Sequence, residues 1–305
     1  MTKAFNIIRN IFAVIGVLST LLIIGFLIFA STSPMFSSHE EDYLLMEERL
    51  NTLRATAPYA KDTATVQIRI LQNEARAQEI RDYFQLDTLY TPDADTWTKA
   101  LAIGQFVATN IPHDNQKEWP KNVNAIGLWE YTKNVAPAFN CRLHSILTFE
   151  LLLAAGLDAK YITCMPQDEE DNDCHVVNEV WLPELSKWAM LDTDMGGHYV
   201  SDTDGTPLSL QEIREHYLSG EKMVMHPGFK KKGSTKKDWY YSYMAKNTYW
   251  FSCWGELSYY QEDHNKADVI RDHYYHLVPS GFDPFGRSDG TSTTDPTQFW
   301  APPVH

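Results

Sequence analysis

A cysteine begins a predicted helix in the segment "NCRLHSILTFELLLAAGLDAKYI", which runs over residues 140–162. Asn140 is a favourable N-cap and Gly156 a favourable stop, so we expect a helix over residues 141–155. Cys141 would then lie at the positive end of the helix dipole, where unpaired backbone N–H groups favour the thiolate over the thiol. Taken alone, a cysteine here is more typical of a small buried residue. Its position nevertheless makes Cys141 a candidate nucleophile.

A histidine and a carboxylate that could serve this thiolate follow on two predicted strands. The segment "HVVNEVWL" begins at His175, and "KWAML" ends just before Asp192. With a symmetric turn between Leu182 and Lys187, the two strands form a hairpin in which His175 lies opposite Asp194 and diagonal to Asp192. Both aspartates share the face of His175, so strand alternation does not choose between them.

The order of these three segments resembles that of the transglutaminase-like superfamily of papain-type cysteine enzymes. The resemblance covers about residues 95–200 and is strongest over residues 140–195. It implies that Cys141 is the nucleophile, His175 the general acid and base, and Asp192 the orienting carboxylate. It also implies a helix that opens with the nucleophile, packed on an antiparallel sheet. The predicted fold class is therefore α+β, transglutaminase-like.

Members of that family commonly carry a glycine before the cysteine, where this chain has Phe139 and Asn140. The backbone N–H of Cys141 is the natural first donor to an oxyanion, and Trp129 and Gln105 are weak candidates for the second. His144, one turn further along the helix, reads as a packed or surface histidine rather than a substrate contact.

Long helical patterns precede these strands. Charged and leucine residues alternate at helical spacing over residues 38–57, a second helical pattern spans residues 65–86, and a third begins at Asp95 or Thr96 and ends near Asn110. After residue 221 the chain carries a lysine-rich run and a dense aromatic stretch. We expect that stretch to pack on the core as an ordered but irregular extension, with sugar or peptide binding by its rings as the alternative.

The N-terminus has a different character, because residues 11–30 carry no charge and are long enough for a helix to cross a bilayer. We interpret them as an uncleaved anchor rather than a signal peptide, whose apolar stretch is usually shorter. Lys3 and Arg9 precede the span and acidic residues follow it, which keeps the N-terminus cytoplasmic. The bulk of this single-pass protein would then be periplasmic or extracellular.

These patterns predict four regions. They are a cytoplasmic tip, anchor and linker over residues 1–37, a helical extension over 38–94, the catalytic core over 95–220, and the aromatic extension over 221–305.

Composition limits the partners. The net charge is −14, with 26 Lys plus Arg against 40 Asp plus Glu, so nucleic acid is an unfavourable partner. No nucleotide or flavin fingerprint is present, and we expect no cofactor and no metal. The acidic loop "DEEDND" matches no complete calcium motif and reads as a solvated loop. Cys164 and Cys174 flank this loop and would form a disulfide or remain free thiols.

The function predicted from these observations is acyl transfer on amide or peptide bonds by Cys141, His175 and Asp192. A peptide, protein or glycopeptide would be the substrate, and hydrolysis is favoured over cross-linking. The alternative is a surface module on the same fold that binds peptide or glycan without chemistry. A third hypothesis is an envelope scaffold that recruits a partner through the helix next to the membrane.

Overall fold

The computed structural model describes residues 5, 7, 12, 14–24, 34–194, 199–226, 237–271, 273–286 and 289–305, without the side chains of residues 34–43. The chain divides into two compact units, residues 1–48 and 49–305. No helix among the described residues is long and apolar enough to cross a membrane. The anchor predicted over residues 11–30 lies partly outside the described residues.

Four helices that frame the fold begin in the same way. Asn73, Asp95, Asn124 and Asn140 each accept a hydrogen bond from the backbone N–H three residues later, which satisfies one of the free donors at a helix start. The helices are α2 (Pro34–Arg54), α3 (Glu74–Phe84), α4 (Thr96–Asn110), α5 (Ala125–Asn134), α6 (Cys141–Ala154), α7 (Leu210–Ser219), α8 (Lys237–Asn247) and α9 (Pro296–Phe299), with a 3₁₀ turn η1 (Leu86–Thr88).

The centre of the larger unit is a six-stranded mixed sheet in the order β10-β9-β7-β2-β3-β4. Within this sheet, only the β9 and β10 pair is parallel. The described residues also form two separate sheets of two strands each. The strands are β1 (Arg69–Ile70), β2 (Ala159–Met165), β3 (His175–Leu182), β4 (Lys187–Leu191), β5 (Tyr199–Ser201), β6 (Val224–His226), β7 (Trp250–Trp254), β8 (Glu256–Leu257), β9 (Tyr274–Leu277) and β10 (Gly290–Thr293).

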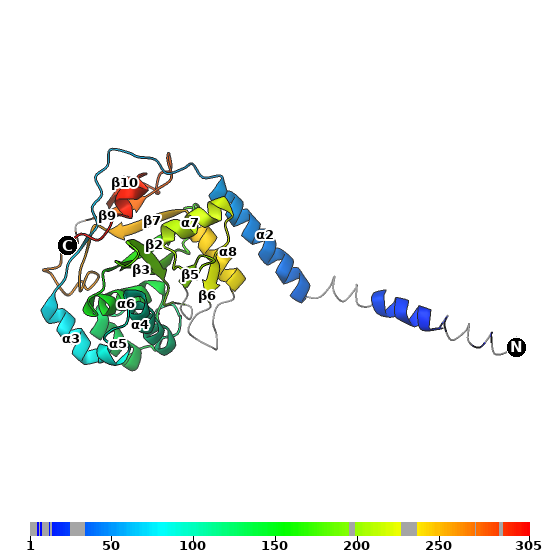
Figure 1. The fold of residues 1–305 in the computed structure, drawn as a ribbon, viewed down its shortest axis with the longest axis horizontal. Helices are drawn as coiled ribbons and strands as arrows, with labels where there is room; N and C mark the ends of the chain where they lie inside the picture. The colour runs from blue at the N-terminus through cyan, green and yellow to red at the C-terminus, as the bar shows by residue number, and fades with distance from the viewer. Residues whose placement is uncertain are drawn as a thin grey trace. The chain divides into compact units, whose positions relative to one another are not determined.

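Helix α6 lies in the core, between this sheet and other helices. Every residue from Leu143 to Ala154 is buried, which explains the apolar run that follows the cysteine. The helix packs on β2 and β3 and on α3, α4 and α5. Figure 1 shows α3 to α6 gathered on one side of the sheet. Only the first turn of α6, with Cys141 and Arg142, is half-exposed.

The hairpin of β3 and β4 has the register that the sequence predicts. Leu182 pairs with Lys187, and the pairing continues to Asn178 and Leu191. Beyond this ladder the chain carries His175 on one strand and Asp192 on the other. The alternation of side chains along both strands therefore directs these two residues to the same face. The α+β class predicted from the sequence is confirmed.

Two regions differ from the sequence-based expectation. The helical pattern predicted over residues 65–86 is wrong for its first part, because Arg69 and Ile70 form β1 beside β8 and the helix begins only at Glu74. Tertiary pairing outweighs local propensity there. The aromatic extension is also more regular than expected, since β7, β9 and β10 form half of the central sheet.

Candidate active site

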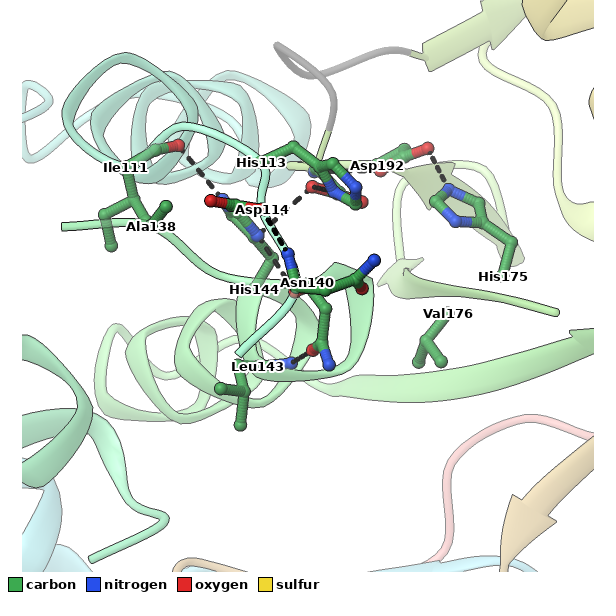
Figure 2. Close-up of polar contacts among 12 residues, drawn as sticks. Ile111, His113, Asp114, Ala138, Asn140, Leu143, His144, His175, Val176 and Asp192 are labelled. Carbon is green, nitrogen blue, oxygen red and sulfur yellow. Dashed lines mark hydrogen bonds and ion pairs between the residues drawn. The ribbon is translucent and has the colours of Figure 1, made fainter. Parts of the chain in front are cut away.

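Cys141 is the first residue of α6. The Asn140 side chain accepts a hydrogen bond from the Leu143 backbone N–H at 3.1 Å, so the helix starts where the sequence predicts (Figure 2). The helix stops at Ala154, and Gly156 adopts a positive φ of 77°, which is the conformation that favours glycine. The thiol is half-exposed at the positive end of the helix dipole.

Cys141 differs from the other cysteines in its surroundings. The structure has all four as free thiols, so Cys164 and Cys174 form no disulfide. Burial raises the pKa of Cys164 well above its ordinary value, raises that of Cys253 to about 12, and raises that of Cys174. A thiol with a raised pKa is a poor nucleophile at neutral pH.

His175 is the first residue of β3 and is fully buried. Its Nε2 lies 2.6 Å from Oδ2 of Asp192, and its Nδ1 is buried without a hydrogen bond (Figure 2). A ring nitrogen of His175, Sγ of Cys141 and a carboxylate oxygen of Asp194 lie within 4.8 Å of one another. The imidazole of His175 therefore lies close to the thiol.

Electrostatics favour the protonated form of His175. Burial alone would lower the pKa of the imidazole, but the charge and hydrogen bond of Asp192, together with Cys141, raise it well above the ordinary value. A charged imidazole stabilises a thiolate beside it, because opposite charges at this distance attract strongly in a buried site. These contacts thus favour the imidazolium form of His175.

The Asp192 carboxylate is held from three directions. Oδ2 accepts from His175 and from the Tyr240 hydroxyl at 2.7 Å, and Oδ1 accepts from the Asp194 backbone N–H at 2.9 Å. The side chain is completely buried. A buried carboxyl group held by this many donors is fixed in place, and it fixes the ring that it contacts.

Asp194 contacts two other histidines. Nδ1 of His113 lies 2.8 and 2.9 Å from its two oxygens, and Nδ1 of His144 lies 3.2 Å from Oδ1. Burial alone would raise the pKa of Asp194, but the hydrogen bond from His113 and the charges of the neighbouring imidazoles lower it. The bond to Asp194 in turn raises the pKa of His113. The second aspartate thus belongs to a His–Asp pair of its own.

His144 is packed beneath this pair and is fully buried. Its Nε2 lies 3.0 Å from the Ile111 carbonyl and its Nδ1 lies 3.0 Å from the Asn140 carbonyl (Figure 2). Both ring nitrogens therefore have polar partners within the core. His144 therefore supports Asp194 and the helix start, in line with the prediction of a packed residue.

The C-terminal part of the chain covers His175. The Tyr243 ring of α8 packs edge-on against His175 at 5.3 Å, and its hydroxyl donates to Oδ1 of Asp173 at 3.0 Å. Trp239 stacks on Tyr243 at 4.7 Å. In the same helix, Tyr240 bonds Asp192. Residues some sixty positions beyond His175 therefore complete its surroundings.

The two weak oxyanion-hole candidates have other roles. Trp129 stacks on Phe106 at 5.1 Å and packs edge-on against Phe84, and Gln105 is exposed on α4. Among the described residues no hydrogen bond or ring contact joins either side chain to Cys141. Instead, Oε1 of Gln116 accepts from the Asn140 backbone N–H at 3.1 Å, beside the nucleophile.

Sequence reasoning missed His113 and Tyr240. His113 follows a proline in a loop, and the parallel bridge from His113 to Phe139 places it beside the helix start. Neither residue belongs to a periodic pattern or a motif. For His113, the one signal in the sequence was a histidine next to a proline. That combination is too common to identify a functional residue.

The acidic loop before His175 is tied to α8. Nζ of Lys246 lies 2.7 Å from Oδ2 of Asp171 and 2.7 Å from the Asp173 carbonyl. Beside the loop lies a cavity of about 330 Å³, whose walls include Arg142 and Cys174. These two residues are the sequence neighbours of Cys141 and His175. The cavity therefore adjoins the candidate site.

Comparison with known proteins supports the class that this geometry suggests. Residues 74–193 match the model of the transglutaminase-like superfamily. The resemblance to this superfamily is thereby confirmed for that part of the chain, which carries a cysteine at a helix start and a histidine and an aspartate on paired strands. No curated protein matches the chain.

Two solved structures are similar over part of the chain. A "putative cysteine protease" from Cytophaga hutchinsonii is 15% identical, with a TM-score of 0.31, 40% of this chain and 39% of that chain being covered. A "putative protease" from Parabacteroides distasonis is 12% identical, with a TM-score of 0.25, 37% of this chain and 24% of that chain being covered. The chain thus spans less than half the length of either structure, and similarity at this level carries no argument about mechanism.

Proposed function

We propose that this protein is a cysteine enzyme that transfers the acyl group of an amide or peptide bond through Cys141. The observation that supports this most is the position of His175, which bonds Asp192 through one nitrogen and leaves the other free beside the thiol. A thiolate, an imidazole and an orienting carboxylate in this order are the parts that nucleophilic acyl transfer requires.

The proposed reaction uses the charges described above. The Cys141 thiolate attacks the carbonyl carbon, and the imidazolium of His175 gives its proton to the leaving amine as the C–N bond breaks. A thioester on Cys141 and a neutral imidazole remain. His175 then takes a proton from water, whose oxygen displaces the sulfur, and the acid product leaves with the thiolate restored.

Hydrolysis is the proposed outcome, with transfer to an amine as the other outcome of the same thioester. The cavity beside Arg142 and Cys174 would accept the substrate, because its walls include the sequence neighbours of both reacting residues. A peptide, protein or glycopeptide is the proposed substrate class. The proposed roles are nucleophile for Cys141, acid and base for His175, and orienting carboxylate for Asp192.

We also propose that residues 11–30 anchor the protein in a membrane, with the N-terminus cytoplasmic and the larger unit on the opposite side. This rests on the uncharged sequence and on the positive residues that precede it. The anchor would hold the enzyme near substrates in the cell envelope or on the cell surface.

A peptide library with mass-spectrometric readout tests the proposed activity. Wild-type protein should release new amine termini or ammonia, whereas Cys141→Ala should release none and Cys253→Ala, a change at a buried thiol outside the cavity, should retain activity. Adding a primary amine separates hydrolysis from transfer, since only transfer incorporates the amine. Equal product release by wild type and Cys141→Ala would refute the proposal.

A further inference from the structure

The reacting groups of this site are also a set of metal ligands. Among the residues that the structure describes, Cys141, His175 and Asp194 offer one sulfur, one nitrogen and one oxygen within 4.8 Å of one another. Thiolate, imidazole and carboxylate are the three ligand types that zinc prefers. We propose that the site binds Zn²⁺ through these three residues, and that the ion thereby blocks the nucleophile.

The second nitrogen of His175 is the observation that points to a ligand. Nδ1 is fully buried with no hydrogen bond in the structure, so it is open to the Cys141 thiol or to an ion bound between the two residues. Nε2 bonds the Asp192 carboxylate at 2.6 Å. A histidine whose second nitrogen bonds a carboxylate is the arrangement that orients imidazole ligands in zinc sites.

Asp194 is likewise held for this role. Its bonds to His113 and His144 fix the carboxylate in place. Asp192 bonds the His175 imidazole and so supports a ligand, whereas Asp194 is itself the proposed ligand.

The spacing requires a small adjustment. Ligand atoms around a tetrahedral zinc ion, with bonds of about 2.0–2.3 Å, lie roughly 3.3–3.8 Å apart. The three atoms lie within 4.8 Å of one another, so any separation near that limit must shorten by about 1 Å. Cys141 is half-exposed, so water would occupy the fourth position from the open side of the site.

Binding changes the protonation of the pair. The thiol and imidazole together hold one proton before the ion binds, and Zn²⁺ takes the thiolate sulfur and the neutral imidazole nitrogen. One proton is thus released to solvent for each ion bound, and affinity increases with pH. The metal site itself does not depend on turnover, whereas inhibition by zinc rests on the proposed function.

Cobalt titration of the metal-free full chain tests the site without an enzyme assay. One Co²⁺ per chain should bind and produce a thiolate-to-cobalt charge-transfer band in the near ultraviolet. Cys141→Ala should abolish the band, and Asp194→Asn should weaken binding by about tenfold or more. Asp171→Asn, in the acidic loop outside the ligand set, is the matched control and should bind as wild type does.

Three results would overturn the inference. They are a band that persists in Cys141→Ala, a wild-type protein that yields no band, or an Asp194→Asn variant that binds as tightly as the wild type. If Asp194→Asn does not fold, the test is whether zinc chloride slows the alkylation of wild-type Cys141 by iodoacetamide. An unchanged alkylation rate would contradict the proposed site. Absence of peptide hydrolysis by the metal-free protein would refute the proposed function and leave the cobalt result standing.

Discussion

Asp194 donates its backbone N–H to the Asp192 carboxylate at 2.9 Å, while their side chains serve different histidines. Asp192 bonds His175, and Asp194 bonds His113. The short segment at the end of β4 thus orients one imidazole beside the thiol and fixes a second carboxylate next to the same thiol. Because the two aspartates contact different histidines, the same Asp→Asn substitution should have different effects at the two positions.

Asp192→Asn should lower kcat for a model amide or ester by roughly 10²- to 10⁴-fold, because an amide cannot hold His175 in the same tautomer or stabilise its charged form. Asp194→Asn should cause a smaller loss, since the His175 contact to Asp192 remains. Steady-state kinetics of both purified variants provide the measurement. A larger loss for Asp194→Asn would mean that the carboxylate roles are reversed.

Tyr240→Phe should lower the free energy of unfolding by about 1–3 kcal/mol, because it removes a buried hydrogen bond to the Asp192 side chain. The kcat should fall less than in Asp192→Asn, since the other bonds to the carboxylate remain. Tyr131→Phe is the matched control for losing a tyrosine hydroxyl, because that hydroxyl donates to the Glu118 backbone carbonyl at 2.6 Å. Its effect on the free energy of unfolding should be smaller than that of Tyr240→Phe. Urea unfolding measures the first effect, and equal stability of Tyr240→Phe and wild type would contradict it.

His113 should make stability depend on pH. The bond to Asp194 raises its pKa above the ordinary value of 6.5, so its contribution is fully present below about pH 6.5 and is lost as pH increases through the folded value. His113→Asn keeps a hydrogen-bond donor but does not titrate. Between pH 6 and 9 the unfolding free energy of wild type should therefore fall more steeply than that of His113→Asn. Parallel curves for the two proteins would show that His113 has no such linkage.

The membrane proposal predicts that the full chain stays with the membrane pellet after an alkaline carbonate wash, whereas residues 38–305 alone are released. The reason is the burial of about twenty apolar residues in the bilayer. Protease should reach the larger unit when it is added to intact cells or, for a periplasmic location, to spheroplasts. Recovery of the full chain in the soluble fraction would exclude an anchor.

Much of the site could be predicted because its signals are local. Asn140 caps a helix that begins at Cys141, and the turn between Leu182 and Lys187 sets a register that brings His175 to the face of two aspartates. Strand alternation did not separate Asp192 from Asp194, and only the family resemblance favoured the former.

The remainder depends on contacts between residues far apart in sequence. Tyr240 bonds Asp192 from a helix 48 residues later, and His113 reaches Asp194 across 81 residues. Such contacts follow from the packing of the whole unit, in which β7, β9 and β10 extend the sheet. Local propensity carries no information about them, so the sequence indicated neither residue.

The rate at which iodoacetamide alkylates Cys141 near neutral pH tests the central claim most directly, because only the thiolate reacts. Peptide mapping assigns the labelled cysteine, and the buried Cys253 provides an internal reference. Fast labelling of Cys141 that slows by tenfold or more in His175→Ala is the predicted result. Slow labelling that is the same in wild type and His175→Ala would contradict it, since the imidazole would then have no influence on the sulfur.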